Sequence, residues 1–496
     1  MLTVDLLRRS RQAWPDAAAV EWEGGSWTYG QLYRRAAGVA RGLRSLGVRP
    51  GEFVAALLPN TPEYFPIYFG IQAAGSVLVA VNPLFREEEI AHILRDSAAA
   101  AIFVPERLYP RVAALAGRLP PTLRHVVLLG REVPDTVPYA ELLTAGEEFP
   151  DPGVDEGAVA ACLYTSGTTG APKGALLTHA NLTFDVAAIL QVVPLTERDC
   201  FLGVLPYFHS FAQMGNLLLP VAVGARTVVL EAFRPEAVVS AMTGSGVTVF
   251  AAVPAMFAAL AAAGQKLPTL RLCISGGAPL PPTVAAAFRR SCGLELLEGD
   301  GPTETSPVAY VTPPAGPVKP GSVGPPLPGV AVRILDEAGR ELPRGQVGEV
   351  AVHGPNVMRG YLNRPEETAE ALRDGWLRTG DLGYLDEDGY VFLVDRKKDL
   401  ILSGGMNVYP REVEEVLLTH PAVAQAAVVG RMHPLRGETV RAVVVLRLGQ
   451  TATAGELGAF CRQHLAAFKC PREVEFREEL PLLPTGKVDK KALRQS

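Results

Sequence analysis

Residues 164–174 read YTSGTTGAPKG, a stretch of hydroxyl-bearing residues and glycines that contains one lysine, Lys173. Apolar segments flank it at residues 158–164 and 175–177, and each has the composition of a buried β-strand. Glycines let such a loop close over a ligand, and its backbone N–H groups, hydroxyls and ammonium are groups that bind phosphate. The stretch does not match G-x-x-x-x-G-K-[ST], because Pro172 and Lys173 stand where that motif needs other residues. We therefore predict a phosphate-binding loop between two strands, with a Ser/Gly linker as the alternative.

The length and composition indicate a soluble protein of more than one domain. A single hydrophobic core stops growing near about 250–300 residues, so 496 residues predict at least two globular units. With 48% hydrophobic and 20% charged residues and a formal net charge of −5, the chain has no basic excess that would favour nucleic acid. The six cysteines are scattered, without a C-x-x-C pair, which disfavours a zinc site and fits a reducing cytosol. We predict a cytoplasmic protein.

Short apolar runs alternate with helical patterns through most of the chain. Residues 53–59 (FVAALLP) and 125–130 (HVVLLG) are typical of strands, and residues 28–47 are typical of an amphipathic helix. Such alternation predicts α/β layers with largely parallel sheets. The uncharged run 237–265 is interrupted by glycines and by Pro254, so it predicts helix, strand and helix in a soluble core rather than a membrane span.

The composition changes near residue 320, where glycine, charge and short strands become more frequent. The charge-dense stretch DRKKD (395–399) then precedes a compact segment of helices and strands. We place the main domain boundary there. The prediction is a large N-terminal domain over residues 1–396, with a β-rich subdomain over about 320–396, and a small C-terminal α+β domain over residues 397–496.

Further motifs follow the loop in order: GDGPTET (299–305), WLRTGD (376–381), DRKKDLILSGGMNVYPREVE (395–414) and LPTGKVDKKAL (483–493). With YTSGTTGAPKG they make the chain resemble the adenylate-forming superfamily, which includes acyl-CoA synthetases, luciferases and peptide-synthetase adenylation domains. The resemblance runs from about residue 27 (WTYGQL) to the end, and the long third motif is most similar to fatty-acyl-CoA ligases. It implies layered α/β sheets, a mobile C-terminal domain, and activation of a carboxylic acid by ATP.

The resemblance assigns a nucleotide site. Glu304 matches the family's magnesium-binding glutamate, with Thr165 as its hydroxyl partner, and this oxygen chemistry suits Mg²⁺. Asp381 matches the residue that accepts both ribose hydroxyls; a plain turn residue is the alternative. The predicted catalytic residues are Lys487, Lys173, Thr303 and Glu304. The predicted ATP- and AMP-binding residues are Thr165, Ser166, Gly167, Thr168, Thr169, Gly170, Lys173, Gly276, Gly277, Ala278, Asp300, Gly301, Thr303, Asp381, Arg396 and Lys487.

One of these positions departs from the family pattern. The family usually has an aromatic residue at the position of Asp300, where it stacks on adenine, and a carboxylate cannot stack. We therefore expect the backbone at Asp300 and the segment Gly276-Gly277-Ala278 to line the base.

The resemblance implies that the C-terminal domain acts in both steps of the reaction, adenylation and thioester formation. Lys487 matches the lysine that bridges the substrate carboxylate and the phosphate, with a solvated basic tail as the alternative. The family then turns this domain about a hinge, matched here by Lys398, so that coenzyme A reaches the acyl-adenylate. The predicted coenzyme A residues are Lys398, Ser403, Gly404, Gly405 and Met406.

The acyl pocket or its gate is predicted from Phe208, His209, Met214, Val253 and Met256. An acidic residue that would hold an amino acid's ammonium is missing after Phe208, and the apolar run 253–264 disfavours a dicarboxylate. We predict a medium- or long-chain fatty acid as substrate, with an aryl acid such as a cinnamate or benzoate as the alternative. An acyl-AMP ligase serving a carrier protein and a non-catalytic nucleotide sensor are further alternatives. The sequence leaves a homodimer and peripheral membrane association open.

Overall fold

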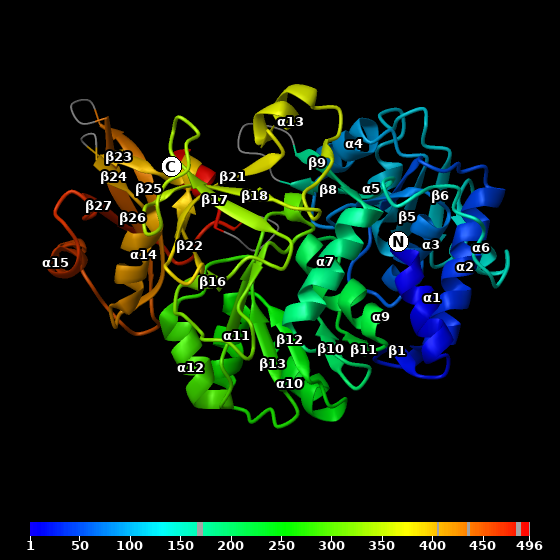
Figure 1. Cartoon of the computed structure of the whole chain (residues 1–496), viewed down its shortest axis with the longest axis horizontal. Coiled ribbons are helices and arrows are strands. Elements are labelled where there is room, and N and C mark those ends of the chain that lie inside the picture. Colours follow the sequence, from blue (N-terminus) through cyan, green and yellow to red (C-terminus); the bar gives the residue numbers. More distant parts are fainter. Residues whose placement is uncertain (166–171, 404–405, 434–436, 483–487, 496) are drawn as a thin grey trace. The chain divides into compact units, whose positions relative to one another are not determined.

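The computed structural model describes residues 1–165, 172–403, 406–433, 437–482 and 488–495. Helices and strands follow one another throughout these ranges (Figure 1). The backbone divides into two compact units. The first contains Met1–Ala331 and Val352–Leu377, and the second contains Val332–Ala351 and Arg378–Ser496.

The first unit is built on two eight-stranded sheets. One sheet carries the strands that flank the glycine-rich loop. Its order is β19 (Gly360–Tyr361), β9 (Lys173–Thr178), β8 (Val159–Thr165), β4 (Val77–Ala80), β3 (Phe53–Ala56), β5 (Ala101–Pro105), β6 (His125–Leu129) and β7 (Val137–Pro138). The strands from β8 to β7 pair in parallel, whereas β9 is antiparallel to both β8 and β19. The loop therefore lies between two strands, as its flanking apolar runs predict, and the structure shows that these strands are antiparallel.

The second sheet carries the segments assigned to the base and the acid. Its order is β15 (Tyr310–Val311), β14 (Leu297–Asp300), β13 (Leu272–Ser275), β12 (Val249–Ala252), β10 (Cys200–Gly203), β11 (Arg226–Val229), β1 (Ala18–Trp22) and β2 (Gly25–Thr28). The pairs from β14 to β1 are parallel, and the two outer pairs are antiparallel. This is the largely parallel α/β arrangement expected from the alternating apolar runs.

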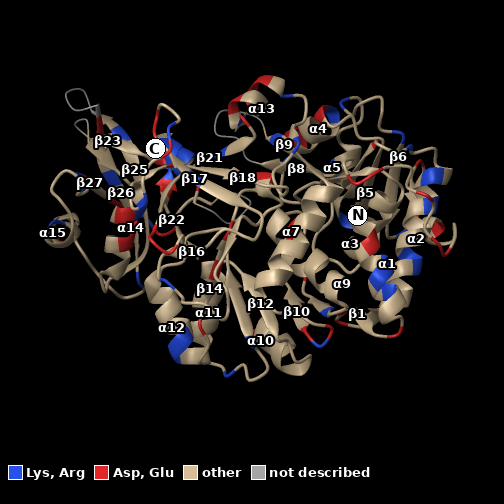
Figure 2. Cartoon of the chain, in the orientation of Figure 1, with Lys and Arg blue, Asp and Glu red and all other residues tan. Residues whose placement is uncertain are grey.

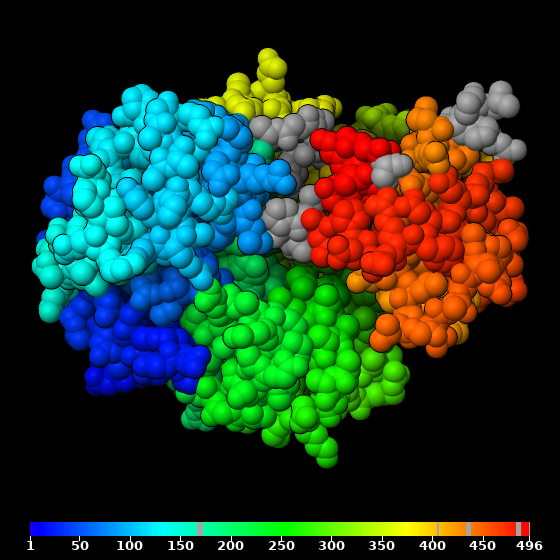
Figure 3. Space-filling view, turned by 180° about the vertical axis from the view of Figure 1, so that it is seen from behind, coloured from blue at the N-terminus to red at the C-terminus, as the bar shows by residue number. Residues whose placement is uncertain are grey.

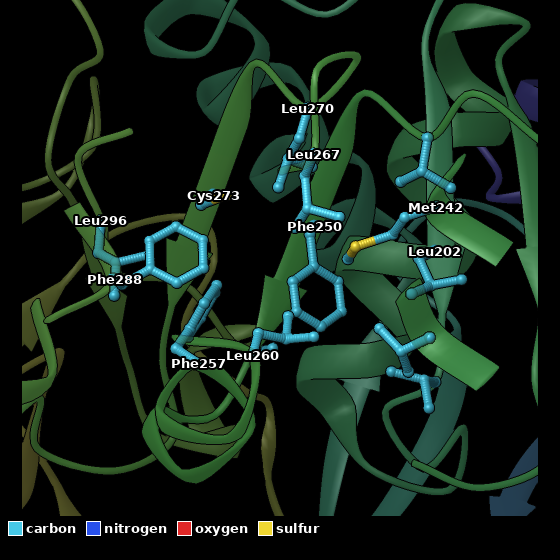
Figure 4. Packing of buried hydrophobic residues seen from close by; sticks show 14 of the residues in the cluster. Leu202, Met242, Phe250, Phe257, Leu260, Leu267, Leu270, Cys273, Phe288 and Leu296 are labelled. Atoms are coloured by element: carbon cyan, nitrogen blue, oxygen red, sulfur yellow. The ribbon is translucent and has the colours of Figure 1, made fainter. Parts of the chain in front are cut away.

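An aromatic core lies beside this second sheet (Figure 4). Phe257 packs edge-on against both Phe250 and Phe288, with ring centroids 5.3 and 5.1 Å apart. The uncharged run 237–265 forms α10 (Pro235–Gly244), β12 and α11 (Pro254–Ala263) around this core, which confirms the predicted helix, strand and helix. Within the described ranges, the helices are all too short or too polar to cross a membrane.

The second unit contains most of the β-rich segment and the C-terminal strands. The first group is β17 (Ala331–Leu335), β18 (Gly348–His353), β21 (Trp376–Leu385) and β22 (Val391–Arg396). The second group is a sheet in the order β24 (Met406–Val408), β23 (Ile401–Ser403), β26 (Gly437–Leu446) and β25 (Val423–His433), with β27 (Glu473–Phe476) beside β26. In Figure 3 the segments from β25 onward, coloured orange to red, lie together on one surface. The predicted domain boundary at residues 396–398 stays a prediction.

Helices α14 (Pro410–Thr419) and α15 (Ala454–His464) pack on the C-terminal sheet. Val413, Leu417, Leu457 and Cys461 supply the buried side chains of the two helices, and Val428 and its neighbours supply those of the sheet. α14 begins with Pro410, which suits the first turn of a helix because proline lacks an N–H there. The predicted small α+β arrangement at the C-terminus matches this part of the structure.

Candidate active site

The two end residues of the phosphate loop face each other across a strand pair. Thr165 is the last residue of β8, Lys173 is the first residue of β9, and the strand register places them opposite each other. The hydroxyl and the ammonium assigned to phosphate therefore stand where the loop begins and ends. Within the loop, the predicted residues Ser166, Gly167, Thr168, Thr169 and Gly170 lie outside the described residues.

The PTET motif forms a 3₁₀ turn, Thr303–Thr305, shortly after β14. Gly301 precedes it at a crowded place, because a Cβ there would lie 2.3 Å from the carbonyl oxygen of Pro307. The hydroxyl of Thr303 is 3.2 Å from the hydroxyl of Ser210, within hydrogen-bond distance. This contact joins Thr303, a predicted catalytic and ATP-binding residue, to the segment that carries His209.

Buried polar groups hold this turn in place. Asn356 donates its side-chain N–H groups to the carbonyl oxygens of Thr305, at 3.1 Å, and Val308, at 2.9 Å. Asp185, on α7 (His179–Val192), is fully buried and accepts a hydrogen bond from the backbone N–H of Val308 at 3.2 Å. Burial raises the pKa of the Asp185 carboxyl well above its ordinary value. The protonated form of Asp185 is thereby favoured.

Glu304 and Lys173 both contact the side chain of Tyr361. The Tyr361 hydroxyl donates a hydrogen bond to Oε1 of Glu304 at 2.7 Å, and Nζ of Lys173 lies 5.3 Å from the centre of the Tyr361 ring. Lys173 also forms an ion pair with Glu367, on α13 (Pro365–Ala371), the acidic helix visible in Figure 2. The sequence predictions include neither Tyr361 nor Glu367, because long-range contacts such as the β9–β19 pairing bring these distant positions together.

The two segments predicted to line adenine lie at neighbouring strand ends. Gly276 follows β13, and Asp300 is the last residue of β14, its parallel neighbour. A Cβ on Gly276 would lie 2.7 Å from the carbonyl oxygen of Gly299, so the two backbones approach closely. Gly277 and Ala278 continue from this point and are partly exposed.

The predicted acyl residues fall into two groups. Phe208, His209 and Val253 are half-buried, and Val253 follows β12 with its Cγ1 3.9 Å from the place of a Cβ on Gly277. Met214 is only 1% exposed and lies in a fully buried helical segment, Gln213–Leu218, so it belongs to the packed interior. Met256 packs partly against the aromatic core of Figure 4.

A further aromatic residue, Phe211, stands among these groups. Its ring atoms lie 3.2 and 3.3 Å from the place of a Cβ on Gly276 and 3.9 Å from that of a Cβ on Gly215. Nδ1 of His209 accepts a hydrogen bond from the backbone N–H of Phe211 at 3.2 Å, so a neutral His209 carries its proton on Nε2. The sequence stretch HSFAQ contains this phenylalanine, yet nothing in its pattern shows where the ring points.

The predicted ribose residue Asp381 forms an ion pair in the second unit with Arg396, another predicted ATP-binding residue. Asp381 of β21 and Arg396 of β22 are register partners, and Nε of Arg396 is 2.8 Å from Oδ1 of Asp381. Thr379 supports both residues: its hydroxyl accepts from the Asp381 N–H at 3.1 Å, and its carbonyl accepts from Arg396 at 3.3 Å. A carboxylate held in this way can accept hydrogen bonds from vicinal hydroxyls through its remaining lone pairs.

The predicted hinge and coenzyme A residues come shortly after Arg396 in the chain. Lys398 is the middle residue of a short 3₁₀ turn, Lys397–Asp399. Ser403 is buried and Met406 is exposed, and they face each other as register partners of β23 and β24. The remaining predicted residues of this unit, Gly404, Gly405 and Lys487, lie outside the described residues.

The chain on both sides of Lys487 is anchored within the second unit. Leu482 and Val488 form an isolated β-bridge. Nζ of Lys490 lies 2.8 Å from Oε1 of Glu414 on α14, and their side chains are 20% and 17% exposed. Burial raises the pKa of Glu414 despite the nearby ammonium. For Lys490, burial alone would lower the pKa, but Glu414 and two aspartates outweigh it and raise the pKa.

The proposed metal ligands fit magnesium in their chemistry. A carboxylate and a hydroxyl are hard oxygen ligands, and Glu304 keeps lone pairs beyond the one that accepts from Tyr361. In the part of the chain that the structure describes, no three His, Cys, Asp or Glu side chains gather as they would around a metal ion. A magnesium ion here would therefore take most of its ligands from nucleotide phosphates and water, as this ion commonly does.

The predicted nucleotide residues lie in both units: the loop ends, the PTET turn and the predicted adenine segments belong to the first unit, and Asp381 and Arg396 belong to the second. The AMP-binding enzyme family model matches residues 7–362, and that of the AMP-binding enzyme C-terminal domain matches residues 412–487. The chain therefore belongs to the AMP-binding enzyme family. It is an AMP-forming acid–thiol ligase, a class that uses ATP and coenzyme A.

Two relatives and one solved structure are similar over nearly the whole chain. A feruloyl-CoA synthase from Amycolatopsis sp is 42% identical over 496 residues, covering 99% of this chain and 97% of that protein. A long-chain-fatty-acid–CoA ligase from Bacillus subtilis (strain 168) is 35% identical over 526 residues, covering 98% and 93%. An anthranilate CoA ligase in complex with anthranoyl-AMP has a TM-score of 0.93 at 29% identity, covering 100% of this chain and 97% of the other.

Proposed function

We propose that the chain activates an aromatic acid of the cinnamate or benzoate type as acyl-AMP and transfers the acyl group to coenzyme A. Phe211 carries the choice of acid in this proposal, because its half-buried aromatic ring lies beside Gly276 and Gly215, close in sequence to the predicted acyl residues Phe208, His209 and Met214. Planar aromatic groups pack well against such a ring. The higher identity to the feruloyl-CoA synthase than to the long-chain ligase supports this order of candidates.

The nucleotide roles follow from the charge that the reaction must control. Two anions, a carboxylate and a phosphate, have to meet, so we assign Lys173 and Thr303 to the phosphates and Lys487 to the developing charge between the two. Asp381 and Arg396 hold the ribose. Glu304 and Thr165 hold magnesium, which when bound offsets phosphate charge.

The second step needs the thiol at the place that Lys487 occupied in the first. We propose that the C-terminal domain turns about Lys398 between the two steps, and that Ser403 to Met406 line the channel of coenzyme A. His209 lies on the acyl side and acts as a gate rather than as a base, because its Nδ1 is already an acceptor for the Phe211 N–H.

A fatty acid is the second candidate, and it is the one favoured by the sequence prediction. The apolar run after Val253 supports it, as does the 35% identity to a long-chain ligase. A long alkyl chain needs an apolar channel but no flat face, so the two candidates differ in what they require of Phe211.

The test is pyrophosphate release over a panel of ferulate, cinnamate, benzoate and saturated C8–C16 acids, with the thioester identified by mass spectrometry. We expect an aryl acid to give the highest kcat/KM and the thioester to require coenzyme A. Replacing Phe211 by leucine should lower kcat/KM for the aryl acid about tenfold, in line with the loss of an aromatic contact, and should affect a C12 acid less. Turnover of fatty acids alone would reverse the order of the candidates, and acyl-AMP release without thioester would overturn coenzyme A as acceptor.

A further inference from the structure

Tyr361 lies on a segment that is tied to both charged residues of the phosphate site. Its strand β19 pairs with β9, where Tyr361 is opposite Ala175, and the backbone N–H of Leu362 donates to the carbonyl of Gly174 at 2.8 Å. At the other end of the segment, the N–H of Met358 donates to the carbonyl of Glu304 at 2.8 Å. The backbone thus spans the short path from the PTET turn to the strand that begins with Lys173.

The side chain of Tyr361 completes this connection. Its hydroxyl is 2.7 Å from Oε1 of Glu304, and its ring lies beneath the ammonium of Lys173 at 5.3 Å. Its own N–H donates to the hydroxyl of Thr368 at 2.9 Å, which fixes the residue against helix α13. Contacts within the protein therefore hold both the backbone and the ring of Tyr361.

We infer that Tyr361 is a positioning residue whose hydroxyl orients Glu304 toward the divalent cation of the bound nucleotide. This inference rests on the role of Glu304 in the proposed function. A hydrogen bond to one carboxylate oxygen restricts the rotation of the group and leaves its other lone pairs directed at the metal. A neutral phenol suits this task better than a lysine or arginine, because it leaves the negative charge of Glu304 available to the cation.

The inference predicts a selective loss of metal dependence. Partners that orient metal ligands change metal affinity by about 10–100-fold when they are removed. In Tyr361→Phe the ring beneath Lys173 remains, so metal-free ATP binding should stay within about twofold of the parent protein, whereas the gain in ATP affinity caused by Mn²⁺ should fall by about tenfold or more. Both are measured as ATP dissociation constants by titration calorimetry, without acid or coenzyme A, so no turnover enters the result.

Two further variants make the test specific. Tyr33→Phe is the matched control. Tyr33 lies on α2 (Tyr29–Ser45), and its hydroxyl donates to Oε2 of Glu148 at 2.8 Å. Removing this hydroxyl should change neither the metal-free nor the Mn²⁺-bound dissociation constant of ATP. Glu304→Gln should itself reduce the Mn²⁺ effect, and combining it with Tyr361→Phe should add no further loss if the hydroxyl acts through the carboxylate.

The possible outcomes distinguish the role of Tyr361 from the proposed role of Glu304 in metal binding. An unchanged Mn²⁺ effect in Tyr361→Phe, beside a clear loss in Glu304→Gln, would overturn the inference and leave the assignment of Glu304 standing. No loss in Glu304→Gln would overturn both. Equal weakening of metal-free and metal-bound ATP in Tyr361→Phe would mean that the residue serves Lys173 or the local fold instead.

Discussion

The charged side chains assigned to the nucleotide already have partners within the protein. Lys173 is paired with Glu367, and Arg396 is paired with Asp381 at 2.8 Å. We expect a phosphate that binds Lys173 to compete with the Glu367 carboxylate for the ammonium. Because such competition weakens the original ion pair, we expect Glu367 to lower the affinity for ATP.

Glu367→Gln should consequently tighten ATP binding. The Lys173 and Glu367 side chains are 20% and 34% exposed, and pairs near the surface contribute up to about 1 kcal/mol, so we expect the dissociation constant of ATP to fall about two- to fivefold. Glu366→Gln, on the exposed neighbouring position of α13, is the control and should leave it unchanged. Weaker binding in Glu367→Gln would show that the carboxylate holds Lys173 in its working position instead.

Asp185 gives a second test, through pH. Its folded-state pKa is raised by burial, so the folded protein holds a proton that the unfolded chain releases above about pH 4, and this costs stability as the pH rises from there toward the folded-state pKa. Asp185→Asn keeps an acceptor for the Val308 N–H and has no charge to bury. We expect its apparent Tm to exceed that of the parent protein by more at pH 8 than at pH 5.

The alanine variant distinguishes charge from contact at this site. Asp185→Ala leaves the Val308 N–H without its acceptor, which should cost about 1–3 kcal/mol at either pH. Parallel Tm profiles for Asp185→Asn and the parent protein from pH 5 to pH 8 would refute a protonated Asp185.

The helices and strands near the site could be predicted where they depend on local pattern. The runs FVAALLP and HVVLLG form β3 and β6, because apolar residues bounded by turns specify a buried strand. The two-residue strand β19 escaped prediction, since Gly360–Tyr361 has no periodicity of its own and exists through its pairing with β9. Tyr361 and Glu367 were missed for the same reason, whereas Thr303, Glu304 and Asp381 were assigned by motif.

The short C-terminal helix α16 (Lys490–Gln495) is held by the ion pair of Lys490 with Glu414, by the buried side chain of Leu493 and by the ion pair of Arg494 with Asp399. Removing one partner of a buried ion pair costs about 3 kcal/mol or more, so Glu414→Gln should lower the Tm of the second unit and loosen the attachment of the chain beside Lys487. Pyrophosphate release should fall more than thioester formation from supplied acyl-AMP. Glu415→Gln, which breaks only an exposed i,i+4 pair with Arg411, is the control and should change neither rate by more than about twofold. Unchanged adenylation in Glu414→Gln would refute this role of the anchor.

For the molecule as a whole, the sequence predicted two globular units, and the structure has two. What the motifs could not supply is the grouping by compactness, which places Val332–Ala351 and the β21–β22 strands with the C-terminal sheet. That grouping depends on which strands pair across long separations, and local patterns carry no record of such pairing. The direction of the Phe211 ring likewise escaped prediction, because the ring lies beside Gly276, which is distant in the sequence.

The proposed hinge predicts opposite defects at Lys398 and Lys487. Proline fixes φ near −65° and therefore removes a backbone rotation at the hinge. Lys398→Pro should still release pyrophosphate from the acid and ATP. It should no longer form the thioester from supplied acyl-AMP and coenzyme A, because this second step requires the rotation. Lys487→Ala removes a cation from the first step alone, which should slow acyl-AMP formation about 10²–10³-fold and spare the second step. Lys398→Ala keeps the rotation and should retain both steps, and all three proteins are compared at matched Tm. If Lys398→Pro slows both steps equally, or if Lys487→Ala abolishes thioester formation from acyl-AMP as well, the two steps do not require separate positions of the C-terminal domain.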